Sequence, residues 1–564
     1  MQQRGCPLSR SRLAVPKGGA VTSAGAWTIG LAVGYTALLL FGGRWSRVRA
    51  GRPGGQGFFD GGRSFSPWTV AFCITGLFSG SSYISIMELS YRTGISAAWY
   101  GVAETVQILL IALLLVKPLR EKLVVTVTGI IGDRFGRAAK AIAGVITAVT
   151  FPMWSVATTI AFASALTAFT DLPLQWTVTA TALLLLVFLW SGGMRSVAFN
   201  QTLNCLVFVV MLVIAGFVVL SNPGPGGWQE LAATRPAMVD PGNAGLSLIV
   251  AWFGTFIVNV PLAQAAFQMT MSCRSPRDGQ KGLYAAALFG IPFIVLGALV
   301  GTSAAIAVPD QELGLVAVPY YISETLPAPL VGLFFLGVWA CAMGWAGPCQ
   351  FSGATSLGRD VGSALRPKAT EQDLVRYTRY SLVALTALMI LYGILRTEQA
   401  AWWNVLAWTL RNGATLAPVL AVFLWPLASR RAVHAAMLSG FLAGIAWNQL
   451  SGWSATTFFA GIHPVWVGMG INLAVMVVVT LVTVPWESTP DRKRRTAGIR
   501  YTAGGTLVAA ALLTFGEWLG HFGLLGLGLF TAVTLYSLAI FNLTVGTTRR
   551  QHLPTTEETI PVSA

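Results

Sequence analysis

Residues 67–90 read PWTVAFCITGLFSGSSYISIMELS, and this stretch decides the architecture. At about 1.5 Å per residue, it is long enough to cross a hydrocarbon core of about 30 Å as one helix. Gly76 and the sequence Ser-Gly-Ser-Ser at 79–82 lie in its middle. Such small residues also permit close helix packing, but irregular main chain at membrane depth is tolerated only where protein or a cavity surrounds it. The stretch therefore predicts a membrane helix that is broken near its centre.

The composition of the whole chain indicates a membrane protein. Of the 564 residues, 54% are hydrophobic and only 10% are charged, and the mean hydropathy is +0.66. Too few polar side chains remain to cover a water-soluble surface of this size, so the lipid bilayer is the expected partner. The net charge of +16 comes from short basic clusters between apolar runs, a pattern that argues against nucleic acid. The six cysteines form no CxxC pair, so neither a disulfide framework nor a metal site is predicted.

Fifteen apolar runs of suitable length occur between charged or Pro/Gly-rich loops, and they predict an all-α polytopic membrane protein. The runs are 26–43, 67–90, 97–117, 138–168, 175–191, 196–220, 246–270, 282–307, 329–356, 380–396, 402–426, 434–455, 465–485, 501–518 and 523–546.

The positions of Lys and Arg predict the topology, because cytoplasmic loops carry an excess of these residues. If the loop after the first run is cytoplasmic, 29 of the 37 fall in inner loops and in a cytoplasmic tail at 547–564. The outer loops then hold only Arg92, Arg235 and Arg396. This predicts a multi-pass protein of the plasma membrane. A basic N-terminal tail at 1–25 lies outside, and a peripheral helix at 26–45 is retained because it lacks a small-residue cleavage pattern.

The run 246–270 is also interrupted near mid-membrane, by Gly254, Asn259 and Pro261. Unwound main chain offers carbonyl oxygens to a cation and amide groups to an anionic solute. Two broken helices in corresponding positions of two halves of a chain indicate a transporter. The alternative is that these residues serve only helix packing.

Several short motifs follow one another in a defined order. They are Gly-Gly-Arg-Ser at 61–64, Tyr-Arg-Thr-Gly at 91–94, Gly-Gly-Met-Arg-Ser-Val at 192–197, Val-Pro-Tyr-Tyr at 318–321, Leu-Pro-Ala-Pro-Leu-Val-Gly-Leu at 326–333, and Ala-Cys-Ala-Met at 340–343 with Asp360 beyond it. Together they resemble the sodium:solute symporter family over about residues 60–480. The resemblance implies a five-plus-five inverted-repeat core with two broken helices at 60–430, followed by peripheral helices at 431–546. It also implies secondary active transport of a small polar solute by alternating access.

In the resembling family, main-chain carbonyls of the first core helix and two hydroxyls after a Met on the eighth hold a sodium ion. The ion-binding positions that this implies here are Ser81, Ile84 and Cys341.

This chain departs from that pattern at two places. Gly344 and Trp345 follow Met343 and offer no side-chain oxygen, which a hard cation requires. Asn200 and Gln201 stand where a Thr-Asp pair is usual on the fifth core helix. We therefore expect sodium coupling to be weakened or lost, in favour of a proton or of facilitated transport. The alternative is that hydroxyls in a shifted register supply the oxygens, from Ser352, Thr355 or Ser356.

An ionisable side chain at mid-bilayer costs about 2.5–3.5 kcal/mol, so each one needs a partner or a role. We expect Arg411 to contact an anionic or carbonyl group of the solute, or to pair with Glu88 or Glu104. These two carboxyls are also the candidates for proton coupling. The predicted substrate-binding residues are Ser82, Tyr83, Glu104, Asn259 and Arg411.

Other function classes fit the sequence less well. An enzyme needs a nucleophile–base or metal constellation, but the four histidines are far apart in the sequence, so no catalytic residue is predicted. A transporter-like sensor that signals through a partner is the alternative function. No cofactor is expected other than sodium or a proton as coupling ion. The sequence leaves the solute and the oligomeric state open.

Overall fold

The computed structural model describes residues 21–49, 55–121, 126–190, 193–309, 311, 314–396, 400–454 and 457–546. The expectations for the tails at 1–25 and 547–564 therefore lie outside the described residues, apart from 21–25.

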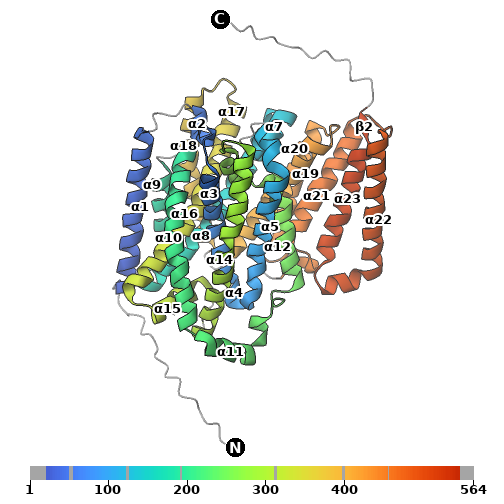
Figure 1. Cartoon of the computed structure of the whole chain (residues 1–564). Helices are drawn as coiled ribbons and strands as arrows, with labels where there is room; N and C mark the ends of the chain where they lie inside the picture. The colour runs from blue at the N-terminus through green and yellow to red at the C-terminus, as the bar shows by residue number, and fades with distance from the viewer. Residues whose placement is uncertain are drawn as a thin grey trace, which may run out of the picture.

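The chain folds into a bundle of helices (Figure 1). Its first half contains α1 (Ser23–Arg49), α2 (Gly55–Asp60), η1 (Gly61–Arg63), α3 (Pro67–Phe78), η2 (Ser79–Tyr83), α4 (Ile84–Thr93), η3 (Gly94–Ala97), α5 (Ala98–Leu110), η4 (Ile111–Leu115), α6 (Val116–Glu121), α7 (Val127–Phe135), α8 (Arg137–Thr170), α9 (Leu174–Trp190), α10 (Met194–Ser221), α11 (Gly224–Thr234) and η5 (Pro236–Val239).

The second half contains α12 (Leu246–Asn259), η6 (Val260–Leu262), α13 (Gln264–Met271), α14 (Pro276–Ala307), α15 (Gly314–Thr325), α16 (Ala328–Thr355), η7 (Ser356–Val361), α17 (Gly362–Leu365), α18 (Glu371–Leu395), α19 (Ala400–Leu424), α20 (Arg430–Leu450), η8 (Phe459–Gly461), α21 (Pro464–Thr483), α22 (Arg492–His521) and α23 (Leu525–Leu543). Two short strands, β1 (Trp486–Glu487) and β2 (Val545–Gly546), pair antiparallel.

Each of the fifteen predicted runs coincides with a helix. Among the described residues, 11 helical stretches are long and apolar enough to cross a membrane, or 12 if the bent pair 246–271 is one span. The smaller number arises because the runs 67–90 and 97–117 form one stretch, Pro67–Arg120, and because Leu174–Trp190 is short. The helix at 434–455 does not reach the same apolarity. The all-helical membrane fold is confirmed, and the number of fifteen crossings stays a prediction.

The ends of the bundle agree with the topology expected from the basic residues. Figure 1 shows α11, from a predicted outer loop, at one end of the bundle. The short helices α2, α7 and α17, which lie within predicted cytoplasmic loops, are at the other end.

The centre of the bundle is formed by α8, α16 and α19. The most apolar segment of α8 is 89% buried inside the bundle, and that of the stretch Ala328–Leu365 is 83% buried. Helix α8 contacts both α16 and α19. The peripheral helix α22 is the opposite case, since only 6% of its apolar segment is buried and it packs mainly against α23. The polar groups of the central helices are therefore the ones held away from lipid.

The two predicted breaks take different forms. The first is the π-helical turn η2, whose flanking residues keep right-handed helical dihedral angles, so the helix is widened rather than unwound. Ser79 Oγ donates to the Gly76 carbonyl at 2.8 Å inside this region. The second break bends α12–η6 against α13 by 47°. Pro261 lies there and has no amide hydrogen to donate.

The first break packs closely against α16. A Cβ atom at Gly80 would lie 2.2 Å from Trp345 Cβ and 2.7 Å from the Cys341 carbonyl oxygen, and one at Gly344 would lie 2.7 Å from the Gly76 oxygen. Glycine is therefore required on both helices for this approach. The interpretation that small residues serve helix packing therefore holds at Gly80 and Gly344. It does not conflict with ligand binding at the break.

Candidate functional site

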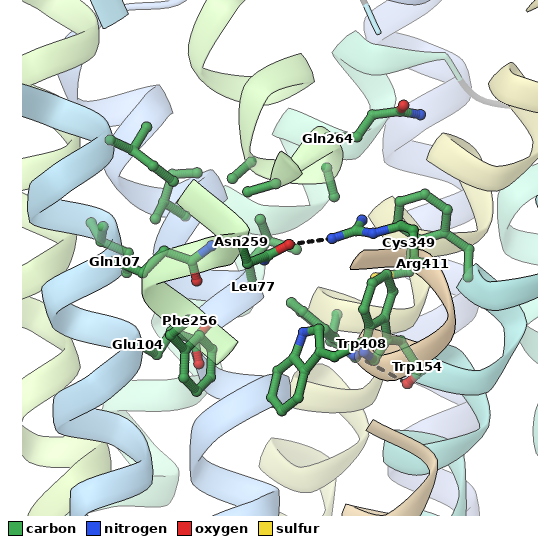
Figure 2. A pocket seen from close by; sticks show the side chains of 18 residues that line it. Leu77, Glu104, Gln107, Trp154, Phe256, Asn259, Gln264, Cys349, Trp408 and Arg411 are labelled. Atoms are coloured by element: carbon green, nitrogen blue, oxygen red, sulfur yellow. Dashed lines mark hydrogen bonds between the residues drawn. The ribbon is translucent and has the colours of Figure 1, made fainter. Parts of the chain in front are cut away.

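A pocket lies at the centre of the bundle, at the level of both breaks (Figure 2). Its 18 lining residues come mostly from α3, α5, α8, α12, α13, α16 and α19. The empty volume is about 550 Å³, including the part open to solvent, which is in the range of small-molecule sites.

Arg411 is the cationic group of the pocket. It is only 3% exposed, one of its terminal nitrogens donates to Asn259 Oδ1 beside the second break, and its Nε has no partner among the described residues. The guanidinium carbon lies 4.4 Å from the Trp154 ring centre and 5.6 Å from that of Phe151. These aromatic faces stabilise the charge in part, but no carboxylate neutralises it within the described chain.

Glu104 is the carboxyl group of the same pocket. It is 6% exposed and accepts a hydrogen bond of 2.5 Å from Ser82 Oγ in the first break. Figure 2 shows Glu104 and Arg411 on opposite sides of the pocket, and they form no ion pair with each other. The predicted pairing of Arg411 with Glu104 is therefore absent, and a buried guanidinium and a buried carboxyl line one cavity.

Aromatic residues close one end of the pocket. We call Tyr100, Trp252, Phe256 and Trp408 the outer aromatic cluster, because Tyr100 lies in the first turn of α5, which follows a predicted outer loop. Ring centres lie 5.3 Å apart for Tyr100 and Phe256, 4.8 Å for Phe256 and Trp408, and 5.7 Å for Tyr100 and Trp252. Phe256 and Trp408 line the pocket, so the cluster forms part of the pocket wall on the side of that predicted outer loop.

Gln264 lies at the other end of the pocket (Figure 2). Its Oε1 accepts from the Val127 amide at 3.2 Å, and its Nε2 donates to the Ser352 carbonyl at 3.2 Å and to Ser356 Oγ at 2.8 Å. One side chain thus links α7, α13, α16 and η7 on the predicted cytoplasmic side.

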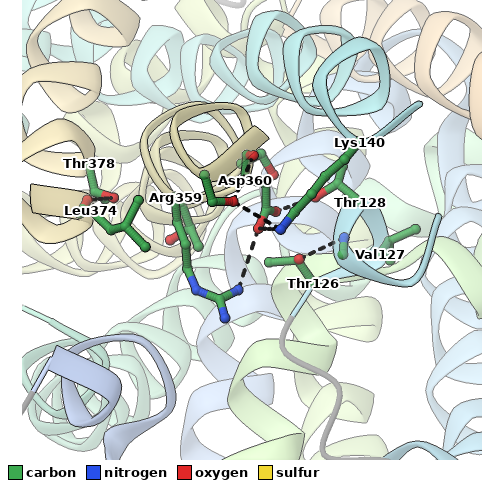
Figure 3. A network of polar contacts seen from close by, with 12 residues as sticks. Thr126, Val127, Thr128, Lys140, Arg359, Asp360, Leu374 and Thr378 are labelled. Atoms are coloured by element: carbon green, nitrogen blue, oxygen red, sulfur yellow. Dashed lines mark hydrogen bonds and ion pairs between the residues drawn. The ribbon is translucent and has the colours of Figure 1, made fainter. Parts of the chain in front are cut away.

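A buried carboxylate lies on the same side (Figure 3). Asp360, fully buried in η7, accepts a hydrogen bond from Thr128 Oγ1 of α7. Arg359 Nη1 lies 3.4 Å and Lys140 Nζ 4.0 Å from its Oδ1. The network holds α7, α8 and η7 together at the predicted cytoplasmic end of the bundle.

The structure brings Glu104, Asn259 and Arg411 of the predicted substrate residues to the pocket. Ser82 reaches it through its bond to Glu104. Tyr83 lies outside the lining, with its ring 5.6 Å from that of Phe293 on α14. Glu88 is partly buried on α4 and also lies outside the lining.

The predicted sodium position lies between the first break and α16. Ser81, Ile84 and Cys341 are buried where the first break meets α16, and the Cys341 carbonyl faces Gly80. Gln201 Nε2 donates to the Gly344 carbonyl at 2.7 Å. An amide donor therefore occupies a main-chain carbonyl of α16 beside the predicted sodium position.

The hydroxyls of the shifted register are engaged elsewhere. Ser352 Oγ donates to Gln268 on α13, and Thr355 Oγ1 donates to the Phe351 carbonyl at 2.8 Å. Ser356 Oγ accepts from Gln264.

Sequence reasoning missed several residues of this site. Trp408, Phe256, Gln264 and Cys349 line the pocket without belonging to any motif. The available signal was position: Gln264 follows the Pro261 break by three residues, and Trp408 precedes Arg411 by three on the same helix.

Comparison with known sequences gives the family. The sequence model of the sodium:solute symporter family matches residues 58–444, more than half of the chain. The chain belongs to the sodium:solute symporter family. This symporter is 23% identical over 456 residues to a sodium/glucose cotransporter of Vibrio parahaemolyticus, and the alignment covers 73% of this chain and 82% of the relative. It is also 23% identical over 406 residues to the human high affinity choline transporter 1, and that alignment covers 66% of this chain and 69% of the relative.

Among solved structures, a Na⁺-coupled sialic acid symporter superimposes with a TM-score of 0.66 at 14% identity. The match covers 81% of this chain and 98% of the other, and it supports the fold. The symporter is a secondary active transporter of a small solute and a multi-pass protein of the plasma membrane. The relatives are transporters by name, and they give no support to the sensor alternative.

Proposed function

We propose that this symporter carries a small polar solute with an anionic or carbonyl group, which binds to Arg411 and Asn259 in the central pocket. The observation that carries the proposal is the guanidinium of Arg411, which is buried and lacks a carboxylate partner within the described chain. An unpaired buried charge is costly, and a solute that brings the opposite charge removes that cost on binding.

The pocket lies between two closures that serve alternating access. On the outer side the solute would displace or rotate Phe256 and Trp408, and on the inner side it would pass Gln264. Transport requires only that these two ends open in turn, while the solute stays on Arg411 at mid-membrane. The proposal assigns no catalytic residue and no cofactor other than the coupling ion.

The Vibrio relative and the sialic acid symporter are both named for sodium, and we propose that a cation also drives this symporter. Binding at the position between the first and eighth core helices is weakened, because Gly344 and Trp345 provide no side-chain oxygen and Gln201 donates to the Gly344 carbonyl.

The test is the melting temperature of the purified protein with sugars, amino acids, carboxylates and nucleobases, each in sodium and in choline buffer at two pH values. A ligand that binds only the folded state raises the melting temperature. A charged hydrogen bond contributes about 1.5–3 kcal/mol, so Arg411→Gln should weaken binding of the stabilising solute by about 10- to 100-fold. Arg376→Gln, at an exposed position on α18, is the control and should leave solute affinity unchanged. If Arg411→Gln lowers stability and leaves solute affinity unchanged, the arginine only fixes helix packing.

A further inference from the structure

Buried oxygen atoms gather between the first break, α5 and α19. We call Ser81, Ser85, Tyr100, Glu104 and Asn404 the oxygen cluster; all five are at most 6% exposed. The Tyr100 hydroxyl lies beside the side chains of Ser81, Ser85 and Asn404, and Ser81 in turn lies beside the Glu104 carboxylate. Four helical elements, η2, α4, α5 and α19, thus contribute oxygens to one connected group.

Most of these oxygens have unused lone pairs. Within the described chain, Ser81 Oγ, the Tyr100 hydroxyl oxygen and Asn404 Oδ1 form no hydrogen bond of normal geometry. Asn404 directs its amide nitrogen at Ser85 Oγ, at 3.0 Å, which leaves its carbonyl oxygen free. Buried polar atoms normally have partners, so three orphaned oxygens around one carboxylate require an explanation.

The Glu104 carboxyl has no cationic partner at this point. It forms no ion pair among the described residues, and Ser82, which donates a hydrogen bond to it, is neutral. The other titratable groups that face it are Tyr100 on its own helix, Cys349 on α16 and Arg411 on α19, and Arg411 is directed to Asn259. A cation at the cluster would neutralise Glu104 and take up the orphaned oxygens together.

From this arrangement we propose that the oxygen cluster is a binding site for one sodium ion, ligated by Glu104, Ser81, Tyr100 and Asn404. The proposal deepens the proposed symport function and rests on it. Sodium is a hard cation that takes several oxygen ligands, which this cluster supplies. A proton on Glu104 would use one acceptor and leave the other oxygens orphaned. The site is separate from the position between the first break and α16, where Gln201 donates to Gly344.

The site is placed to control access to the pocket. Glu104 lines the pocket, and the Tyr100 ring belongs to the outer aromatic cluster. An ion bound to the Tyr100 hydroxyl would hold that ring in the closed cluster. Sodium binding would therefore favour closure of the predicted extracellular side.

The experiment measures sodium binding without solute, by ²²Na⁺ binding to the purified full chain and by its melting temperature in NaCl against choline chloride at constant ionic strength. Wild type should bind sodium saturably. Glu104→Gln keeps the shape and should weaken sodium binding by at least about 10-fold, since a charge-assisted ligand contributes about 1.4 kcal/mol or more. Tyr100→Phe keeps the ring, Ser81→Ala removes one hydroxyl, and each should weaken binding by about 3- to 10-fold.

Ser303→Ala is the matched control. It removes a buried hydroxyl of α14, outside the cluster, that forms no hydrogen bond of normal geometry within the described chain, and it should leave sodium affinity within twofold of wild type.

Two results would overturn the proposal. One is sodium binding that survives in Glu104→Gln and Tyr100→Phe. The other is a wild-type protein that responds to pH and not to sodium, which would assign the carboxyl to a proton. A solute panel without any Arg411-dependent hit would remove the proposed solute site while leaving a Glu104-dependent sodium response in place, so the two failures are distinguishable.

Discussion

Gly80 offers a direct test of the contact between the first break and α16. A methyl group at this position would lie 2.2 Å from Trp345 Cβ, which is 1.2 Å short of the 3.4 Å at which ordinary contact begins, and 2.7 Å from the Cys341 oxygen. Neither atom moves by side-chain rotation, so the two helices must separate. Overpacking costs about 1–3 kcal/mol, and this rigid contact places Gly80→Ala near the upper value.

The gain in helix propensity offsets part of that loss. Alanine is about 1 kcal/mol better than glycine inside a helix, which leaves a net destabilisation of about 2 kcal/mol for Gly80→Ala. The matched control is Gly30→Ala on α1, where nothing lies within 4 Å of the added methyl group. That control gains the propensity and meets no neighbour.

The assay is thermal unfolding of both variants in the same detergent, followed by tryptophan emission. Gly80→Ala should melt below wild type, and Gly30→Ala at or above it. If Gly80→Ala melts at the wild-type temperature or higher, the close approach of the two helices does not exist as described, and the account of the first break as a tightly packed turn is wrong.

Three further outcomes are expected. Burial lowers the pKa of His463 from 6.5 to about 3. As the pH falls, the unfolded chain therefore binds a proton on this histidine before the folded chain does. The contribution of His463 to the free energy of unfolding is complete above pH 6.5 and is lost progressively towards pH 3. Between pH 7 and pH 5, wild type should therefore lose up to about 2 kcal/mol more than His463→Asn, whose amide oxygen can still accept from Val465, in denaturant unfolding at each pH. Asp360→Asn removes the charge that Lys140 faces and should destabilise by about 1–3 kcal/mol in the same assay, whereas no change would make the network incidental. Gln201→Ala should lower the melting temperature, but sodium should still raise the melting temperature of this variant as it does that of wild type. If sodium no longer raises it, the ion binds beside Gly344 instead.

The sequence predicted the parts of this structure that depend on helix length and on depth in the membrane. The apolar runs located the helices, and Glu104, Asn259 and Arg411 line one pocket because each lies near the middle of a predicted apolar run. Apolarity and length decide these features locally, without reference to neighbouring helices.

Features that depend on helix rotation could not be predicted. A π-turn adds a residue to a turn and so rotates everything that follows, which is why Ser82 points to Glu104 while Tyr83 packs on α14. Tyr100 and Asn404 meet although about three hundred residues separate them, and no local pattern marks such a pair. Their juxtaposition follows from the packing of whole helices.

Tyr100 belongs to two structures at once, since its ring is part of the outer aromatic cluster and its hydroxyl part of the oxygen cluster. Because they share one side chain, closure of the aromatic cluster and ion binding at the oxygen cluster are thermodynamically linked. If a bound ion stabilises the closed aromatic cluster by some free energy, closure must strengthen ion binding by the same free energy. Substitutions in Trp252 or Phe256, which never touch the ion, should then alter its affinity. The coupling between gate and ion would reside in a single phenol group.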